Sequence, residues 1–431
     1  MKNNCNLLAI DLGSSSARIM LAQLEDDQKF SIKELARFSH APLVVDGIFR
    51  WDINNLFDNL QGAVDDALSK YVISSIGICS WGVDYGLITN GGKLFDQPIC
   101  YRDNRGQKAY DDVHGAKSCV MTQQELFEKS GIYPNSINTL YQLVADVAEK
   151  RYCEQDCLKF VFIADLFAWR LTGKVFAEKT NASTSGLLDL DGKDWNWQLI
   201  QQLGLDGNIF PQLVNSGECY GQYKGVDVKA VCTHDTASAV YGMDGLDDES
   251  LFISSGSWIL VGALCARPIV SKQVFERGYT NERGYGNCVT LLNNMNGLFV
   301  IQRLVAELGV TYKQIDEEVD SAKCLAIVDT NKLTSPQDMV GQIKALVGAS
   351  DISPMDLIKT AYDSLATNIA KAIEQLEVVV NKKFKKVVIT GGMSKAPYLM
   401  RQFKKLCNLE ICIASGEGAI VGNAKAQIAK K

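Results

Sequence analysis

The segment 233–236, Thr-His-Asp-Thr, joins an apolar run at 226–232 to a stretch at 237–243 whose apolar residues have helical spacing. Backbone N–H groups at the start of a helix are unpaired and, together with the helix dipole, attract phosphate. A carboxylate held there can accept the proton of an attacking hydroxyl during phosphoryl transfer. The segment therefore predicts phosphoryl-transfer chemistry with Asp235 as the general base. The alternative is that Asp235 or Thr236 only caps the helix.

Two further segments, 7–21 and 251–263, share a pattern of an apolar strand, a turn of Gly and Ser, and a second apolar strand. Small residues in such a turn leave backbone N–H groups open to phosphate oxygens, and serine adds a hydroxyl donor. The first turn matches neither G-x-G-x-x-G nor the Walker A motif, and a strand follows it. Asp11 precedes this turn, where a carboxylate can hold a divalent cation through water. An ordinary tight turn is the alternative.

The repeated pattern also predicts how the elements are organised. Two copies in one chain indicate two domains built on one plan, with a cleft in which both turns face the same polyphosphate. The chain has 431 residues, a length that favours two or three domains. The acidic, glycine-containing segment 245–250 is the expected boundary, which gives an N-terminal domain of residues 1–245 and a C-terminal domain of residues 246–431.

Two other segments carry residue types that can bind the substrates of such a reaction. Gly82 allows a ligand to approach the backbone, while Trp81 and Asp84 offer a sugar an aromatic wall and an acceptor. The alternative there is a β-hairpin, closed by the turn at 90–92, with a structural tryptophan. At the end of an apolar strand, the Gly391–Gly392 pair lets a flat adenine or ribose ring lie on the backbone, and a plain tight turn is again the alternative.

Composition and charge argue against several classes of function. The net charge is −6 and no block of Lys and Arg occurs, so nucleic acid is not expected as a partner. No apolar segment reaches the length of a membrane span, and the N-terminus is unlike a signal peptide. The 13 cysteines are scattered, and the closest pair, Cys153 and Cys157, has no histidine near it. We therefore expect a cytoplasmic protein with reduced thiols and no structural zinc site.

Taken together, the motifs resemble those of the FGGY carbohydrate kinases, a family of the actin-like ATPase superfamily, over nearly the whole chain. The matching residues are 9–18 (Ala-Ile-Asp-Leu-Gly-Ser-Ser-Ser-Ala-Arg), 81–84 (Trp-Gly-Val-Asp), 101–105 (Tyr-Arg-Asp-Asn-Arg), 170–173, 180–184, 234–240, 254–258, 281–282, 294, 297–298, 302 and 390–392. Each match is weak alone, but their order and spacing make the set specific. The resemblance implies an α/β fold of two RNase-H-like domains, with mixed sheets flanked by helices, around a central ATP cleft.

The resemblance also implies roles for single residues, with ATP and Mg²⁺ as cofactors. Asp235 looks like the general base, and Asp11 looks like the acid near magnesium. The implied sugar contacts, beside Trp81 and Asp84, are Gly82, His234, Thr236 and Asn294. The implied nucleotide contacts are Ser14, Ser15, Ser16, Ala17 and Arg18 of the first turn, Ser257 of the second turn, Gln302, Gly391 and Gly392.

The implied reaction transfers the γ-phosphate of ATP to the 1-hydroxyl of a 6-deoxy-ketohexose. L-Rhamnulose is the expected substrate, and L-fuculose and D-xylulose are alternatives. Cys79, Ser257, Met393 and the segment 281–284 differ from the pattern of family members that act on L-rhamnulose. Because pockets separate such isomers by single hydrogen bonds, these differences bear on the choice of sugar. A non-catalytic sugar-responsive regulator is the alternative from another class, and the oligomeric state is a monomer or a homodimer.

Overall fold

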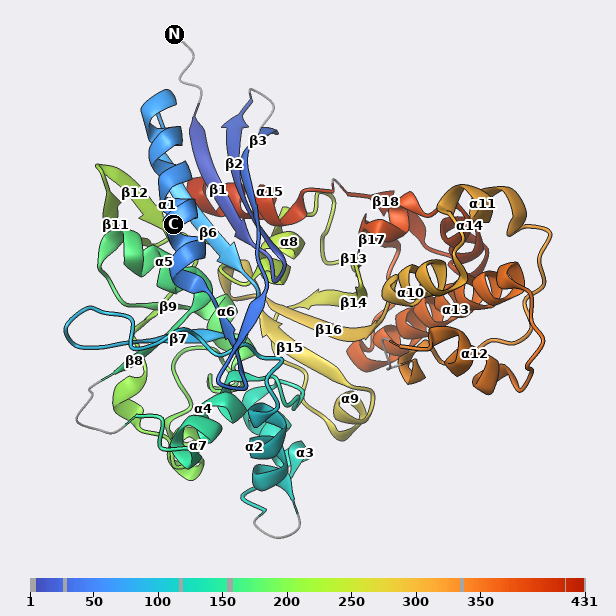
Figure 1. Ribbon diagram of the computed structural model, residues 1–431, viewed down its shortest axis with the longest axis horizontal. Coiled ribbons are helices and arrows are strands. Elements are labelled where there is room, and N and C mark those ends of the chain that lie inside the picture. Colours follow the sequence, from blue (N-terminus) through green and yellow to red (C-terminus); the bar gives the residue numbers. More distant parts are fainter. Residues whose placement is uncertain are drawn as a thin grey trace.

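The structure is a computed structural model that describes residues 5–25, 29–115, 119–152, 158–333, 337–414 and 416–429. Within these residues, two six-stranded mixed sheets are flanked by helices, one sheet in each half of the chain. Figure 1 shows the N-terminal half in blue and green on the left and the helices of residues 299–406 in orange and red on the right. The predicted α/β fold, with two mixed sheets flanked by helices, is confirmed.

The first sheet has the strand order β11-β12-β6-β1-β2-β3. Its strands are β1 (Asn6–Leu12), β2 (Ser16–Leu24), β3 (Phe30–Ser39), β6 (Ser75–Ser80), β11 (Cys219–Tyr223) and β12 (Val226–Lys229). β1 pairs antiparallel with β2 and parallel with β6, and β6 pairs parallel with β12. β6 is buried along its whole length, as expected for a central strand covered on both faces.

The second sheet repeats this plan in the order β15-β16-β14-β13-β17-β18. Its strands are β13 (Ser250–Ser255), β14 (Trp258–Cys265), β15 (Tyr279–Arg283), β16 (Val289–Asn296), β17 (Lys386–Gly391) and β18 (Glu410–Ile413). β13 pairs antiparallel with β14 and parallel with β17, and β17 pairs parallel with β18. The two strand-turn-strand segments predicted from the sequence therefore occupy equivalent places in the two sheets.

Helices and short strands connect and cover the sheets. In the N-terminal half the helices are α1 (Ile53–Lys70), α2 (Arg105–His114), α3 (Gln123–Ser130), α4 (Thr139–Ala148), α5 (Ile163–Thr172), α6 (Lys179–Thr184), α7 (Trp197–Gln202) and α8 (Asp235–Gly242). In the C-terminal half they are α9 (Lys272–Glu276), α10 (Phe299–Leu308), α11 (Tyr312–Glu318), α12 (Met339–Val347), α13 (Pro354–Val380), α14 (Pro397–Leu406) and α15 (Gly418–Ile428). The short strands are β4 (Pro42–Val45), β5 (Ile48–Trp51), β7 (Tyr85–Ile88), β8 (Lys159–Phe162), β9 (Ala177–Glu178) and β10 (Leu213–Val214).

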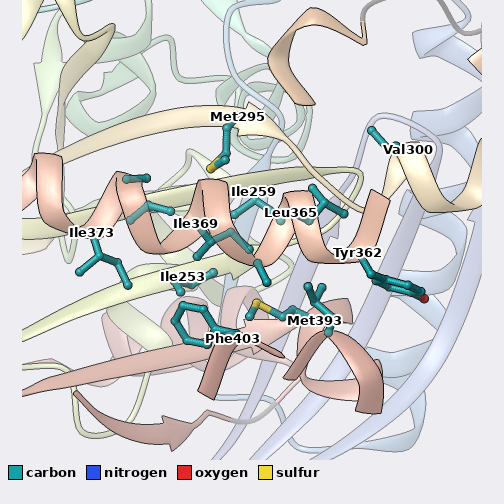
Figure 2. Close-up of a cluster of buried hydrophobic side chains, with 14 of the residues drawn as sticks. Ile253, Ile259, Met295, Val300, Tyr362, Leu365, Ile369, Ile373, Met393 and Phe403 are labelled. Atoms are coloured by element: carbon teal, nitrogen blue, oxygen red, sulfur yellow. The ribbon is translucent and has the colours of Figure 1, made fainter. Parts of the chain in front are cut away.

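The core of the C-terminal half forms around α13, a 27-residue helix whose buried apolar residues recur at helical spacing. The side chain of Ser353 caps its first turn, and a proline at the first helical position has the φ that a helix needs. Figure 2 shows Leu365 and Ile369 of α13 beside Ile253 and Ile259 of the sheet. Burial of each such side chain contributes about 1.5–3 kcal/mol.

The last helix, α15, packs on the sheet of the other half of the chain. In Figure 1 it is the red helix behind β1 and β6, and it contacts α8, β1 and β6. A Cβ atom at Gly422 would lie 1.8 Å from the carbonyl oxygen of Ser238, and one at Gly242 would lie 2.0 Å from the carbonyl oxygen of Gly418. α8 and α15 are therefore in backbone contact. The domain boundary expected at residues 245–250 does not predict that α15, at the end of the chain, packs on the N-terminal half.

The β-hairpin given as the alternative for 81–92, closed by the turn at 90–92, is present: Ile88 of β7 bridges antiparallel to Leu94, and the N–H of Phe95 donates to the carbonyl oxygen of Leu87 at 2.8 Å. β7 also pairs antiparallel with β8, whose residues come about 70 positions later in the chain, and the sequence did not predict this pairing. All four residues of β7 are buried. Cys153 and Cys157 lie outside the described residues, and the described cysteines are free thiols. Among the residues that the structure describes, no helix has both the length and the apolar character of a bilayer span.

Candidate active site

Asp235 is the first residue of α8, and His234 is the residue before the helix. The side chain of Asp235 keeps 33% of its surface accessible, although most of its neighbours in the segment are buried. Burial raises the pKa of Asp235 to about 6; the nearby His234 and hydrogen bonds from Thr236 lower it, and the negative charge of Asp11 raises it. A carboxylate that titrates close to neutral pH suits general-base catalysis.

His234 lies between two carboxylates and is itself buried. Its Nε2 atom is 3.6 Å from Oδ1 of Asp235, and its Nδ1 atom is 3.4 Å from Oε2 of Glu282 on β15. Burial lowers the pKa of His234, but the charges of Glu282 and Asp235 outweigh it, so the pKa is raised overall. The imidazole therefore connects the segment 233–235 of the first half to β15 of the second half.

Gly82 lies against the face of this imidazole. A Cβ atom at Gly82 would be 3.3 Å from two atoms of the His234 ring and 3.1 Å from Oγ1 of Thr184, so a side chain would crowd the contact. The next residue, Val83, has a φ of +68°, and the N–H of Asp84 donates to the carbonyl oxygen of Gly82 at 2.9 Å. This is a strained γ-turn, rare for a β-branched residue. Such strain persists where surrounding contacts fix a functional backbone.

Asp84 is completely buried, and its carboxylate holds aromatic rings in place. It accepts hydrogen bonds from Nε1 of Trp51 at 2.6 Å and from Nε1 of Trp81 at 3.0 Å, while Nε2 of Gln142 donates to its other oxygen. Burial raises the pKa of Asp84 to about 6. The structure thus corrects the expectation that Asp84 accepts from a sugar: it positions Trp81, which is itself only 6% exposed.

The short helix α6 connects three segments that are far apart in the sequence. Each of its three inward hydroxyl groups accepts a hydrogen bond from a backbone N–H of another segment. Thr180 accepts from His234 at 3.2 Å, Ser183 from Arg283 at 3.0 Å, and Thr184 from Val83 at 3.3 Å. α6 therefore fixes the segment 233–235, the γ-turn and β15 relative to one another.

The first Gly/Ser turn closes by a hydrogen bond from the N–H of Gly13 to the carbonyl oxygen of Ser16 at 3.0 Å. Ser14 is half-buried and Ser15 is exposed, so both can reach a ligand. His40 contacts the turn through both its side chain and its backbone. Its Nε2 atom is 2.8 Å from the carbonyl oxygen of Gly13, and its backbone N–H donates to the carbonyl oxygen of Ser15 at 3.1 Å. Sequence reasoning missed His40, because no local pattern links residues 27 positions apart.

Three of the residues expected in the first phosphate turn, Ser16, Ala17 and Arg18, lie at the start of β2. Ala17 pairs with Leu12, and its side chain is fully buried in the core. The guanidinium of Arg18 is held by Asp11 at 2.7 Å and by Glu417, just before α15, at 2.9 Å. β2 begins at Ser16, which pairs with Ser39 of β3, and Ala17 is the first residue of β2 that pairs with β1. The side chain of Ala17 is therefore turned into the core, and the guanidinium of Arg18 is paired with two carboxylates.

Asp11 offers a carboxylate oxygen near Asp235, whose pKa its charge raises. Its side chain is 13% exposed, and the thiol of Cys79 lies 3.9 Å from its Oδ1 atom. Burial raises the pKa of Cys79 well above its usual range, and the charges of Asp11 and Asp235 raise it further. Among the described residues no group of three or more His, Cys, Asp or Glu could hold a metal. The residues fit Mg²⁺, which commonly uses one or two carboxylates together with water and substrate phosphates.

The second Gly/Ser turn is tied to the start of α10. The carbonyl oxygen of Ser257 accepts from the N–H of Gly297 at 3.1 Å and from that of Phe299 at 3.2 Å, and the Ser257 side chain is exposed. Next to α10 lies a cavity of about 310 Å³. Gln302 and Gly392, both expected to contact nucleotide, line this cavity. Its aromatic and aliphatic walls are formed by Leu298, Ile301, Tyr312, Tyr362 and Tyr398.

Gly391 joins this cavity to the second turn. Its φ is +87°, and a Cβ atom there would lie 2.1 Å from the carbonyl oxygen of Ser255, so only glycine fits. The hydroxyl of Ser255 donates to the carbonyl oxygen of Thr390 at 2.7 Å and accepts from the N–H of Met393 at 2.9 Å. Asn294, an implied sugar contact, does not line this cavity. It is an exposed residue of β16 and pairs with Leu260 of β14.

The sequence profile of the FGGY family of carbohydrate kinases, N-terminal domain, matches residues 6–240, and that of the C-terminal domain matches residues 251–430. The chain belongs to the FGGY family of carbohydrate kinases. It is an ATP-dependent sugar phosphotransferase, in agreement with the resemblance of its motifs.

Relatives of this FGGY kinase match along nearly its whole length. It is 30% identical to the rhamnulokinase of Enterococcus faecalis (strain ATCC 700802 / V583), over 98% of this chain and 88% of that protein. It is 31% identical to the rhamnulokinase of Pectobacterium carotovorum subsp. carotovorum (strain PC1), with the same coverage.

Solved structures share the fold. The gluconate kinase from Lactobacillus acidophilus has a TM-score of 0.81 at 16% identity and covers 99% of this chain and 89% of its own. The Plasmodium falciparum glycerol kinase with ADP has a TM-score of 0.81 at 14% identity, with 98% and 89% covered.

Proposed function

We propose that this FGGY kinase phosphorylates the 1-hydroxyl of a 6-deoxy-ketohexose, L-rhamnulose, with Asp235 as the general base. The observation that carries the base assignment is the position of Asp235, partly accessible at the start of α8 beside buried His234, with a pKa raised to about 6. At neutral pH most of this carboxylate is ionised, and it is still basic enough to take a proton from a hydroxyl that is losing it.

In the proposed reaction, Asp235 accepts the proton of the sugar 1-hydroxyl as its oxygen bonds to the γ-phosphorus of ATP. The bond between that phosphorus and the oxygen that bridges to the β-phosphate breaks, and ADP leaves. The transition state is loose, so positioning and charge stabilisation supply most of the catalysis. The first N–H groups of α8, Ser14 to Ser16 and Ser257 would stabilise the phosphate oxygens.

We further propose that Gln302 and the Gly391–Gly392 pair contact the nucleotide, because Gln302 and Gly392 line the cavity beside the second turn. Gly82, Thr236 and His234 would contact the sugar from the first half. Mg²⁺, held near Asp11 through water, would neutralise charge on the phosphates of ATP.

The choice of L-rhamnulose rests on the relatives, since those quoted are rhamnulokinases at about the same identity over nearly the full chain. The test measures initial rates of ADP release with L-rhamnulose, L-fuculose and D-xylulose, and ³¹P NMR identifies the phosphorylated hydroxyl. We expect kcat/KM to be at least about tenfold higher for L-rhamnulose, a difference that one or two hydrogen bonds can produce. A higher value for another ketose would overturn the sugar assignment and leave the kinase intact.

A further inference from the structure

A fully buried carboxylate, Glu178, lies under the catalytic segment at the end of β9. It accepts five hydrogen bonds. Its Oε2 atom accepts from the N–H and Oγ1 of Thr180, the first of these at 3.0 Å, and from the N–H and Oγ1 of Thr233, both at 3.0 Å. Its Oε1 atom accepts from Oγ of Ser216 at 2.7 Å.

These contacts reach the catalytic segment by two routes. Thr233 directly precedes His234 and Asp235, so the two bonds from Thr233 hold the chain at the point where it enters α8. Thr180, which is also bound to Glu178, accepts the N–H of His234 through Oγ1 at 3.2 Å. Capping of α6 alone would not require bonds from Thr233, which lies 55 residues further along the chain.

Burial raises the pKa of Glu178, while its hydrogen bonds from Thr180, Ser216 and Thr233 favour the ionised form. All five partners donate, and an ionised carboxylate only accepts. A buried charge is costly unless donors surround it, so these donors are held to it firmly. The neighbouring Asp165 accepts from the N–H of Glu178 at 3.2 Å and from the hydroxyl of Tyr220. Burial raises the pKa of Asp165 to about 8; the Tyr220 hydrogen bond lowers it, and the Glu178 charge raises it.

We propose that Glu178 is a positioning residue, which holds the segment 233–235 so that the base Asp235 meets the sugar hydroxyl. The proposal rests on the assignment of Asp235 as the base. Glu178 acts through Thr233 and Thr180, and its rigidity comes from the number of donors that converge on one carboxylate.

The test compares two variants, each of which removes one hydroxyl group that donates a hydrogen bond to the Glu178 carboxylate. Thr233→Val removes a bond on the side of the catalytic segment, and Ser216→Ala removes a bond on the far side. We expect Thr233→Val to lower kcat about tenfold or more, as loss of supporting contacts commonly does, with KM for ATP within about twofold of wild type. Ser216→Ala should keep kcat within about twofold at a comparable melting temperature.

A second pair of variants separates geometry from charge. In Glu178→Gln the amide oxygen can accept the four bonds of Oε2, and the amide nitrogen can donate to Ser216, so kcat should stay within about threefold. Glu178→Ala should lose at least tenfold of kcat. Equal losses in Thr233→Val and Ser216→Ala, or wild-type kcat in Thr233→Val, would overturn the positioning role. Wild-type turnover in Asp235→Asn would instead overturn the base assignment, so the two failures are distinguishable.

Discussion

The raised pKa of Asp235 predicts a specific loss of activity in mild acid. The base must be unprotonated, and its pKa is raised from 3.8 to about 6, so activity should fall as the pH falls through about 6. A single ionisation at this pKa leaves about 90% of the base active at pH 7, about half at pH 6 and about 10% at pH 5. With the usual pKa, more than about 90% would stay active at pH 5. The two cases differ about tenfold at pH 5.

The assay measures kcat/KM for the sugar between pH 5 and 8, because this ratio reports the pKa values of the enzyme before it binds sugar. Circular dichroism at each pH shows whether the fold is intact. A second buried carboxylate, Asp84, also has a pKa of about 6 and could produce the same acid limb.

Asp11→Asn distinguishes the two carboxylates. The charge of Asp11 raises the pKa of Asp235, whereas the pKa of Asp84 is set by burial and by bonds from Trp51, Trp81, Tyr101 and Gln142. The residual activity of Asp11→Asn should therefore show its acid limb at lower pH. An acid limb that stays at the same pH in this variant, or a flat profile down to pH 5 in the wild type, would refute the reasoning.

Three further variants test the proposed base, the turn at Gly391 and the contact between α8 and α15. Asp235→Asn should lower kcat about a hundredfold or more with sugar affinity nearly unchanged, as steady-state kinetics and calorimetry can check. Gly391→Ala should raise KM for ATP and lower the melting temperature, whereas Gly348→Ala, at a positive φ with open space around it, should only lower the melting temperature slightly. Gly422→Ala should lower the free energy of unfolding by about 2 kcal/mol or more, measured by urea denaturation, because its Cβ would meet the Ser238 backbone; unchanged stability would contradict the backbone contact of α8 and α15.

The sequence predicts those parts of the fold that depend on neighbours within a few residues. Both Gly/Ser hairpins form as expected. The capping box at Thr122 and Glu125 and the apolar face of the long helix α13 can be read from the sequence in the same way. Each of these signals is local, since caps, turns and helical faces depend on residues that are close in sequence.

Other features depend on which distant segment fills a given space, and local patterns do not predict them. The residue types at Trp81 and Asp84 suggested a sugar contact, but the orientation of Asp84 is decided by Trp51 and Gln142, which arrive from other elements. The role proposed for Glu178 likewise depends on Thr233, which donates to it from 55 residues further along the chain. Spacing in the sequence does not reveal such a carboxylate, because its partners are identified by burial and by convergent donors.

The repeated topology places both carboxylates of the proposed reaction, Asp235 and Asp11, at one edge of the first sheet. In the first sheet, the ends of parallel β1 and β6 place Asp11 beside Cys79, and a bridge between Ser80 and His234 brings Asp235 to the same edge. In the second sheet the equivalent ends, of β13 and β17, place Ser255 beside Gly391. Ligands bind at the carboxyl ends of parallel strands in such sheets. The first edge carries carboxylates that suit proton transfer, whereas at the second edge the buried hydroxyl of Ser255 bonds to the backbone of Thr390 and Met393 and fixes the turn after β17.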